Sequence, residues 1–497
     1  MIAICTLLAI ALDHGILLNS ENHAGLLPVV RRILDPNYLP GDFGISIRIH
    51  HHHAFTWLVA MLSLIFGENG ALELLTVLGY VVLFAGIWRL GGALELAPAR
   101  RLMLGVALAS SALFLDHGVE ANRFLGNGPI MPPTFAHAII VFCIEAIVRQ
   151  RWNLAFALAG AAALLHLQIG GVWMLVLVAT ALHAGVWRQP RRYVPGLVAG
   201  AIIMSPALVD AWALLRHGLI SGIGTMRDIA LRMPQHFEFY ANRVAALALY
   251  FGLFVWLWRR WRATADDRAA RFRPLLCIST CLVVLTAVHY LDYYVVKTGW
   301  LSRLQLLRLS VFIPVLSAFA LIAAPAAKPG GRERWPLALA AVFAIAALGT
   351  QWVKHEPPSL GIADQAQANT DWGDVTRWIR DDGPQGLYLT PPGQIGFTAY
   401  TNRSTVVEFK INPDGGAGLA QWEQRLRDVT GVPLPPGSTR RGVAAELDRA
   451  YARLSQDDVR KLRHDYGVRT AVVPSVSTLQ GHLLYRNSGY RVIALKD

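Results

Sequence analysis

Apolar segments long enough to cross a lipid bilayer recur along residues 1–352, and short polar segments separate them. A helix needs about 20 apolar residues to cross ~30 Å of hydrocarbon. Segments such as Leu72–Trp88, Val194–Leu215 and Leu275–Val296 come near that length. From Lys354 onward the sequence contains no comparable segment. The pattern predicts a polytopic α-helical membrane protein over residues 1–352, followed by a soluble domain at 353–497.

One apolar segment, Ala54–Gly67 (AFTWLVAMLSLIFG), has only 14 residues, which is typical of an interfacial or re-entrant helix. If this segment spans the membrane, Arg89, Arg100 and Arg101 fall on the face opposite to the later basic loops. If it stays in the interface, every short basic loop falls on one face, with 17 Lys and Arg residues against four acids. The positive-inside rule therefore favours an interfacial helix.

This choice predicts eleven spans, a cytoplasmic amino terminus and a periplasmic C-terminal domain in a bacterial inner membrane. The predicted spans are approximately 2–18, 71–88, 102–116, 134–148, 152–167, 169–187, 193–214, 241–258, 274–296, 309–326 and 335–352. The outer face then receives a long first loop, 19–70, and the loops 117–133, 215–240 and 297–308.

The composition agrees with a membrane protein, since 54% of residues are hydrophobic and only 16% are charged. A net charge of +13 would suggest a nucleic-acid partner in a soluble protein. Here the basic residues gather in the predicted cytoplasmic loops, so we expect membrane lipids and no nucleic acid as partners.

Beyond residue 370, short strand-like and helical patterns alternate and predict a small α/β domain. Strands are expected at 386–390, 405–409, 471–474 and 490–495, and helices at 371–380, 419–429 and 444–466. The domain lacks a Gly-rich phosphate loop, a GxSxG elbow and any Cys/His metal spacing. We expect it to cap the membrane site and to shape an acceptor groove.

Acidic residues of the first two outer loops are the candidate catalytic groups, because ionisable side chains close to hydrocarbon tend to mark sites. Glu21 and Asp42 are candidate general bases. Asp116 and Glu120 could face them and hold a divalent cation such as Mg²⁺ or Mn²⁺, although no cofactor is certain. The alternatives are structural: Glu21 caps a helix, Asp42 is a turn residue after Pro40-Gly41, and the second pair is a solvated helix end.

Outer arginines and histidines are the candidate ligands of an anionic substrate, because guanidinium forks bind phosphate bidentately. Arg303 and Arg308 precede a span on the outer side, against the cytoplasmic preference for positive charge. Headgroup anchoring is the alternative role. The run His50–His53 is interpreted as interfacial histidines, since neighbours in an extended chain point in opposite directions. The candidate substrate- or phosphate-binding residues are His23, Arg123, His166, Arg232, His236, Arg303 and Arg308.

The layout resembles the GT-C superfamily of membrane glycosyltransferases, which use polyprenyl-phosphate or polyprenyl-pyrophosphate sugars on the outer face. The resemblance rests on the first outer loop (NSENHAGLLPVVRRILDPNYLPGDF), the segment TWLVAMLSLIFG, the second acidic loop DHGVEANR and the C-terminal α/β domain. The segments LLHLQIGG, RMPQHF and LYLTPPGQIGFTAYTNRSTVVEFK resemble uncharacterised bacterial membrane proteins of this plan.

The resemblance implies roles for particular residues. The family's first-loop acid falls on Glu21, with Asp42 second, and its second acid on Asp116 or Glu120. Lipid-phosphate contacts would fall on Arg232, Arg303 or Arg308. Family members usually carry Asp where this chain has Glu21, and the tail has no WWD-type motif of an oligosaccharyltransferase.

The leading hypothesis is a GT-C-like glycosyltransferase, of hexosyl or pentosyl type, that uses a polyprenyl-phosphate-linked donor. Its acceptor would be a lipid, a glycan or a protein. Glu21 or Asp42 would deprotonate the acceptor hydroxyl, and the arginines would stabilise the leaving phosphate. Two alternatives stay open: a transporter or flippase of a lipid-linked or anionic substrate, and a non-catalytic membrane assembly protein.

Overall fold

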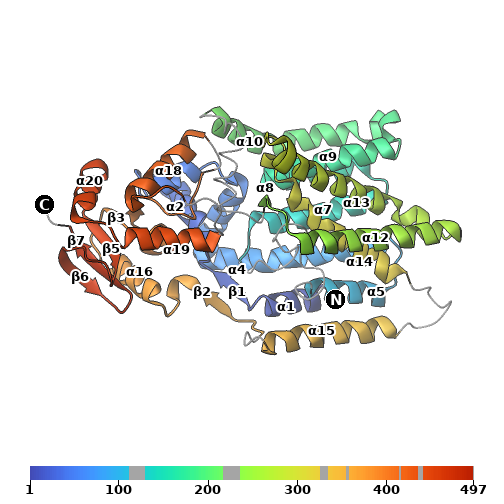
Figure 1. Cartoon of the computed structure of the whole chain (residues 1–497). Helices are drawn as coiled ribbons and strands as arrows, with labels where there is room; N and C mark the ends of the chain where they lie inside the picture. Colours follow the sequence, from blue (N-terminus) through green and yellow to red (C-terminus); the bar gives the residue numbers. More distant parts are fainter. Residues whose placement is uncertain are drawn as a thin grey trace. The chain divides into compact units, whose positions relative to one another are not determined.

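The computed structural model describes residues 1–110, 129–216, 236–324, 334–353, 358–413, 416–434 and 440–495. Internal contacts divide the chain into two compact units (Figure 1). The helical unit comprises Met1–Ile16, Glu73–Val209 and Gln235–Gly361. The mixed unit comprises Leu17–Leu72, Asp210–Pro234 and Ile362–Asp497, so the first predicted outer loop groups with the C-terminal residues.

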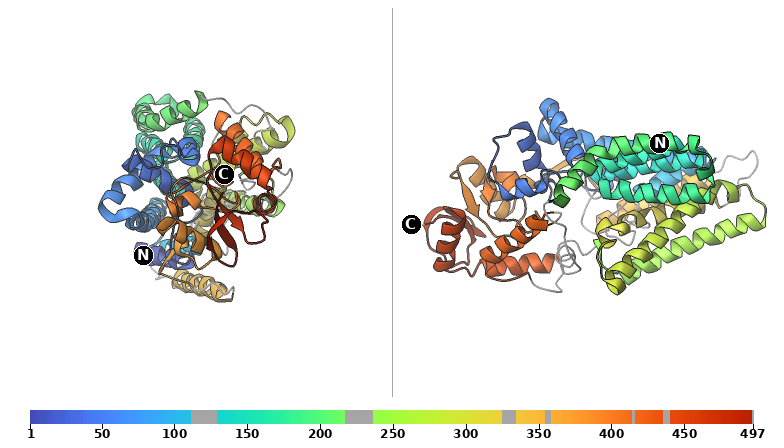
Figure 2. Two further views of the ribbon diagram at one scale, coloured as in Figure 1. Left: turned by 90° about the vertical axis from the view of Figure 1, so that its left-hand side faces the viewer. Right: turned by 90° about the horizontal axis from the view of Figure 1, so that it is seen from above.

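The helical unit is a bundle of apolar helices. Within it α12, α13 and α14 lie side by side (Figures 1 and 2). Large side chains such as Trp152, Trp173, Phe254 and Phe312 are fully buried in its core. The helices are α1 (Ile2–Leu12), α5 (Pro98–Ala109), α7 (Pro132–Val148), α8 (Trp152–Leu165), α9 (Leu167–His183), α10 (Val194–Arg216), α12 (Ala241–Ala263), α13 (Arg268–Tyr290), α14 (Phe312–Ala323) and α15 (Trp335–Val353). The last turns of α10, from Asp210 on, group with the mixed unit.

The helices have the length and surface of membrane spans. Among the described residues, six helices are long and apolar enough to cross a bilayer, and four shorter ones are also apolar. Ile202 of α10 and Ile345 of α15 are 67% and 69% exposed, which suits a lipid-facing surface rather than an aqueous one. The protein is therefore an integral membrane protein. The count of eleven spans and their sidedness stay predictions.

Helix α4 (His53–Ala93) is interrupted at Gly67, whose φ of 71° and ψ of 168° break the helix. A positive φ favours glycine because it has no Cβ. The break coincides with the end of the short apolar segment Ala54–Gly67. On its N-terminal side Trp57, Met61 and Ile65 are exposed at helical spacing and form an apolar face. This face suits an interfacial helix, although its position in a membrane stays a prediction.

The C-terminal part of the mixed unit contains the predicted α/β sheet, with strand order β4-β3-β5-β7-β6. Strands β4, β3 and β5 pair in parallel, whereas β5, β7 and β6 pair antiparallel. Tyr388, Phe397 and Val472 pack with the inner face of α16 in its core. The elements are β3 (Leu387–Leu389), β4 (Ser404–Thr405), β5 (Thr470–Pro474), β6 (His482–Arg486), β7 (Tyr490–Ala494), α16 (Asp371–Asp381), α17 (Phe397–Thr401), α18 (Gly416–Thr430), α19 (Arg440–Tyr451) and α20 (Gln456–Tyr466).

Two expectations for this sheet were wrong in detail. The strand expected at 405–409 is observed only as β4, which ends at Thr405. Three residues further on, the Glu408 carboxylate accepts from the backbone amides of Gly396 and Thr398. Strand β6 was not predicted, although it forms a hairpin with β7 around Asn487–Gly489. There the Asn487 side chain accepts from the backbone amides of Gly489 and Tyr490, a local turn bond that the sequence pattern alone did not reveal.

The first-loop part of the mixed unit contains η1 (His23–Gly25), α2 (Leu27–Leu34) and α3 (Phe43–Arg48). Arg31 of α2 forms two 2.7 Å bonds to the carboxylate of Glu68. It also donates to the Ala399 carbonyl and to Oδ1 of Asn402, each at 2.7 Å. One guanidinium thereby ties α2 to the helix after the break in α4 and to the C-terminal residues. A small two-stranded sheet, β1 (Ile16–Leu18) with β2 (Ile362–Asp364), is also present.

Candidate functional site

The segment that leads into α14 carries the most unusual polar residues of the helical unit. A π-helical turn, Leu291–Val296, follows α13, and the 3₁₀ segment Leu306–Val311 directly precedes α14. Buried Asp292 accepts hydrogen bonds from the backbone amide and the hydroxyl of Ser302, at 2.8 and 2.9 Å, and from the Thr298 hydroxyl. These bonds fix the connecting loop. Single π-turns of this kind are frequent at functional sites.

Arg308 lies between two histidines that are distant in the sequence. Its Nη1 is 2.9 Å from Nε2 of His166, and its Nη2 is 3.3 Å from Nε2 of His236. Its Nε donates to Oε1 of Gln305. Both histidines are buried, at 1% and 5% exposure. The structure thus brings together three of the residues that the sequence nominated as phosphate ligands.

The backbone of α9 bears on the protonation of His166. His166 is the N-cap of α9, and its Nδ1 accepts from the Ile169 amide at 3.3 Å. A neutral imidazole has one N–H and one acceptor, so this cap places the hydrogen on Nε2. Nε2 then faces a guanidinium, which is also a donor.

Arg303 adds a second cation to the same loop. Its guanidinium carbon lies 4.9 Å from the centre of the Trp300 ring, and its carbonyl accepts from Gln168 Nε2 at 3.5 Å. Within the part of the chain that the structure describes, the buried Nε and Nη2 of Arg303 have no hydrogen-bond partner. Burial lowers the pKa of Arg303, and the charge of Asp292 partly offsets this effect.

The position of these cations relative to α14 favours an anion. The N-terminal end of a helix carries positive partial charge and unsatisfied N–H groups. Arg308, in the 3₁₀ segment directly before α14, adds positive charge at this end, where the helix dipole opposes it. A phosphate group would bind the guanidinium forks and the helix terminus together. We name Arg303, Gln305, Arg308, His166 and His236 the arginine–histidine cluster.

The first-loop acids lie in the mixed unit and have different surroundings. Glu21 is exposed, and its carboxylate is 3.4 Å from Nζ of Lys410. Asp42 is buried and caps α3, since its Oδ1 accepts from the Ile45 amide at 2.8 Å. The alternative expected for Asp42 was a turn residue, and the structure shows it instead as the N-cap of a short helix. His23, also predicted as a ligand, is fully buried in η1 of this unit.

Asp42 also lines a cavity together with a second buried carboxyl, Glu408. Glu408 accepts from the amides of Gly396 and Thr398 at 2.9 and 3.2 Å. Burial raises the pKa of Glu408 to about 7, despite these two amide bonds. Burial also raises the pKa of Asp42, and the amide of Ile45 opposes the shift. The cavity thus holds two carboxyl groups whose pKa values are both raised by burial.

Sequence reasoning missed Glu408, because TVVEF was interpreted as a regular strand. The available signal was a lone acid within an apolar strand-like segment. Four predicted site residues, Asp116, Glu120, Arg123 and Arg232, lie outside the described residues. The predicted Mg²⁺ or Mn²⁺ site that would involve the first two therefore stays a prediction.

Comparison with known proteins gives three findings. A family model described as a domain of unknown function, DUF6798, matches residues 370–429. No curated protein sequence matches the chain. In fold, the chain is similar to the oligosaccharyltransferase of Archaeoglobus fulgidus in its apo form, with a TM-score of 0.44, 11% identity, and coverage of 95% of this chain and 69% of that one.

It is also similar to ArnT from Cupriavidus metallidurans, solved with bound undecaprenyl phosphate, with a TM-score of 0.43 and 14% identity. That similarity covers 99% of this chain and 97% of ArnT.

Proposed function

We propose that the protein is a GT-C-type membrane glycosyltransferase that moves a sugar from a polyprenyl-phosphate-linked donor to an acceptor on the outer face of the membrane. The observation that carries the proposal is the position of Arg308 between His166 and His236, at the N-terminal end of an apolar helix. A lipid-linked phosphate combines the two features that this place suits: an anionic headgroup and an apolar chain.

The arginine–histidine cluster would act on the leaving group. When the bond between the sugar C1 and the phosphate oxygen breaks, the electron pair and negative charge pass to the phosphate. Donors that are already in place stabilise this charge without rearranging, and such stabilisation is usually the largest single contribution to catalysis. Arg308 would bind the phosphate oxygens, and His166 would donate its Nε2 hydrogen to them.

The acceptor needs a base, which takes the hydroxyl proton as the acceptor oxygen attacks C1. Glu21 and Asp42 stay the candidates for this role, as the sequence interpretation has them. Glu21 is exposed and its carboxylate is 3.4 Å from Nζ of Lys410, whereas Asp42 is buried and lines the cavity with Glu408.

The test is a deletion strain complemented with variants, followed by profiling of its glycolipids and surface glycans. The wild-type gene should restore a glycosylated product that the deletion lacks, and Arg308→Ala should not restore it. Arg191→Ala is the matched control, because this exposed arginine lies in a loop far from α14 in the sequence. Full restoration by Arg308→Ala would remove the cluster from the mechanism.

Binding of the lipid phosphate is tested separately. Purified full-length protein in detergent should gain thermal stability from undecaprenyl phosphate and not from undecaprenol, which has the same chain without the phosphate. Arg308→Ala should lose this gain.

The same cluster would also suit a flippase for a lipid-linked anion. That function predicts intact lipid-linked precursor accumulating in the deletion strain. A transferase predicts instead the loss of one sugar linkage from the product.

A further inference from the structure

Two histidines of the run His50–His53 face a single carboxylate in the mixed unit. Nδ1 of His50 is 3.0 Å from Oδ1 of Asp210, and Nδ1 of His53 is 3.1 Å from Oδ2 of the same residue. One ligand atom from each of the three side chains lies within 4.8 Å of the other two. The Asp210 carboxylate is only 16% exposed, so this pairing is partly shielded from water.

The backbone explains why His50 and His53 act as a pair. The sequence interpretation assumed an extended chain, in which neighbouring side chains alternate. Instead the chain turns between α3 and α4, with His52 at a φ of 50°, and α4 begins at His53. His50 and His53 therefore point to the same side, with ring centres 6.0 Å apart. His51 and His52 form a separate ring contact at 3.9 Å.

The spacing of the facing atoms suits a small transition-metal ion. Zinc binds imidazole nitrogen and carboxylate oxygen at about 2.0–2.2 Å, so ligand atoms of a tetrahedral site lie roughly 3.3 Å apart. Each histidine is near this distance from one oxygen of Asp210: Nδ1 of His50 is 3.0 Å from Oδ1, and Nδ1 of His53 is 3.1 Å from Oδ2. With one ligand atom from each residue, the three atoms lie within 4.8 Å of one another, so small side-chain shifts would bring them onto one ion. Imidazole ligands favour zinc and its neighbours over Mg²⁺ or Ca²⁺, which prefer oxygen.

We propose that His50, His53 and Asp210 bind one Zn²⁺ ion, with a fourth position open to water. The ion would replace the two hydrogen bonds and join the start of α4 to Asp210. His50 is 42% exposed, so the ion can enter from solvent. The site is independent of the arginine–histidine cluster and of the proposed transferase activity.

Trp57 gives the proposal a distinctive consequence. Its indole Nε1 donates to Nε2 of His53 at 2.7 Å, which places the hydrogen of the ion-free ring on Nδ1. Binding of zinc through Nδ1 moves that hydrogen to Nε2, where it meets the indole N–H. The indole must then turn away. Trp57→Phe removes this competing contact, so it should tighten zinc binding about fivefold.

The experiment uses full-length protein in detergent, stripped of metal with a chelator and titrated with Zn²⁺ against a competing indicator dye. We expect each chain to bind one Zn²⁺ ion tightly. Asp210→Ala should lower the Zn²⁺ affinity by about 10- to 100-fold or more, and so should the double variant His50→Ala with His53→Ala. The double variant His51→Ala with His52→Ala is the matched control and should bind as the wild type does. Substitution with Co²⁺ should give the visible absorption of a tetrahedral site.

Two outcomes would overturn the proposal. If the His51/His52 double variant weakens binding as much as the His50/His53 variant, the run binds metal as a simple polyhistidine segment. If Asp210→Ala leaves the affinity unchanged, its carboxylate only pairs with the histidines. A thermal unfolding curve for each variant shows whether a loss of binding reflects a loss of folding.

Discussion

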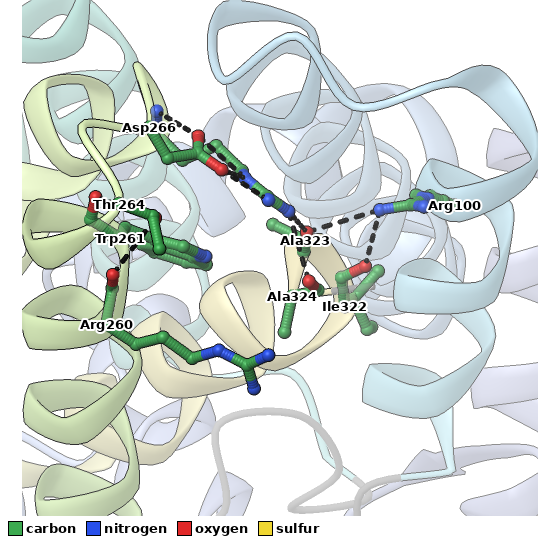
Figure 3. Close-up of polar contacts among 9 residues, drawn as sticks. Arg100, Arg260, Trp261, Thr264, Asp266, Ile322, Ala323 and Ala324 are labelled. Carbon is green, nitrogen blue, oxygen red and sulfur yellow. Dashed lines mark hydrogen bonds and ion pairs between the residues drawn. The ribbon is translucent and has the colours of Figure 1, made fainter. Parts of the chain in front are cut away.

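Helix α14 has arginine side chains at both ends, and the two sets bond in opposite ways. At the C-terminal end, Arg268 donates to the carbonyls of Ala323 and Ala324 at 2.7 and 3.1 Å. Arg100 donates to the carbonyls of Ile322 and Ala323, each at 3.3 Å (Figure 3). These carbonyls belong to the last turn, where a helix leaves its acceptors unsatisfied and attracts cations.

The C-terminal arginines are also held by other groups. Arg268 contacts both carboxylate oxygens of Asp266 through its Nε, at 2.9 and 2.8 Å (Figure 3). It lies 5.3 Å from the centre of the Trp261 ring, and Arg100 lies 5.5 Å from that of Trp335. These cations are therefore structural caps, stabilised by the end of the helix at which they lie.

At the N-terminal end the arginines have different neighbours. Arg308 faces two histidines and an amide, and Arg303 buries N–H groups that no described residue accepts. The comparison shows two different settings for arginine at the ends of one helix. Cations at the C-terminal end bind carbonyls, whereas the helix dipole opposes a cation at the N-terminal end and favours an anion there.

The largest predicted effect tests this distinction at Arg308. Arg308→Ala should lower the rate of sugar transfer about 100- to 1,000-fold, the usual effect of removing one preorganised donor to a developing negative charge. The transfer rate of Arg308→Lys should lie between those of the wild type and Arg308→Ala, because lysine keeps the positive charge but lacks the planar guanidinium fork. The measurement is product formation from a polyprenyl-linked donor in membranes that contain equal amounts of each variant. Equal rates for all three proteins would contradict the assignment.

The buried carboxyl of Glu408 differs from these arginines, because it can lose its charge by taking up a proton. Because the pKa of Glu408 is raised to about 7, the folded protein keeps its proton at pH values where the unfolded chain releases it. Stability should therefore fall as pH rises from about 4.5 to about 7, by roughly 3 kcal/mol at about 1.4 kcal/mol per pH unit.

Thermal unfolding of the full-length protein at pH 5 and pH 7.5 measures this effect. Glu408→Gln should flatten the pH dependence, since the amide cannot titrate. The contribution of Asp42 to the pH dependence should remain in this variant. It should also lower stability as pH rises, because burial raises the pKa of Asp42 as well. Identical pH dependence for the wild type and the variant would show that Glu408 does not control it.

A smaller loss is expected at the opposite end of α14. Arg268→Ala removes the bonds to two carbonyls and the pair with Asp266, which should destabilise the fold by about 1–3 kcal/mol. Activity per folded molecule should stay the same, in contrast to Arg308→Ala. Unfolding and transfer assays on the same preparations separate the two effects. A variant that is stable and inactive would mean that this end also takes part in function.

The smallest effect is expected for Arg100→Lys. Both of its carbonyl bonds are long, at 3.3 Å, and lysine keeps a positive charge near the last turn. We expect a change in unfolding free energy below about 1 kcal/mol. A loss larger than that of Arg268→Ala would reverse the ranking of the two caps.

Local sequence patterns predicted a large share of the secondary structure. Helices α16 and α18 and strands β5 and β7 were expected close to their observed positions, because each has its own period and its own turn or cap. Strand β6 was missed, since its hairpin depends on a single Asn side chain. Local sequence patterns also could not predict that residues 17–72 group with residues 362–497, because this grouping depends on long-range contacts such as that of Arg31 with Asn402.

The sequence by itself indicated that the chain is a membrane protein, and it nominated several of the side chains that could carry chemistry, although not Glu408 or Asp210. Hydrophobic length and charge distribution suffice for both, since they reflect the cost of placing each residue in hydrocarbon. Only the tertiary structure decided which of these side chains meet. His166, His236 and Arg308 come from three separate segments, and their contact depends on how the helices pack. The same packing sets which end of α14 each arginine occupies, and so whether its neighbours are helix carbonyls or histidine side chains.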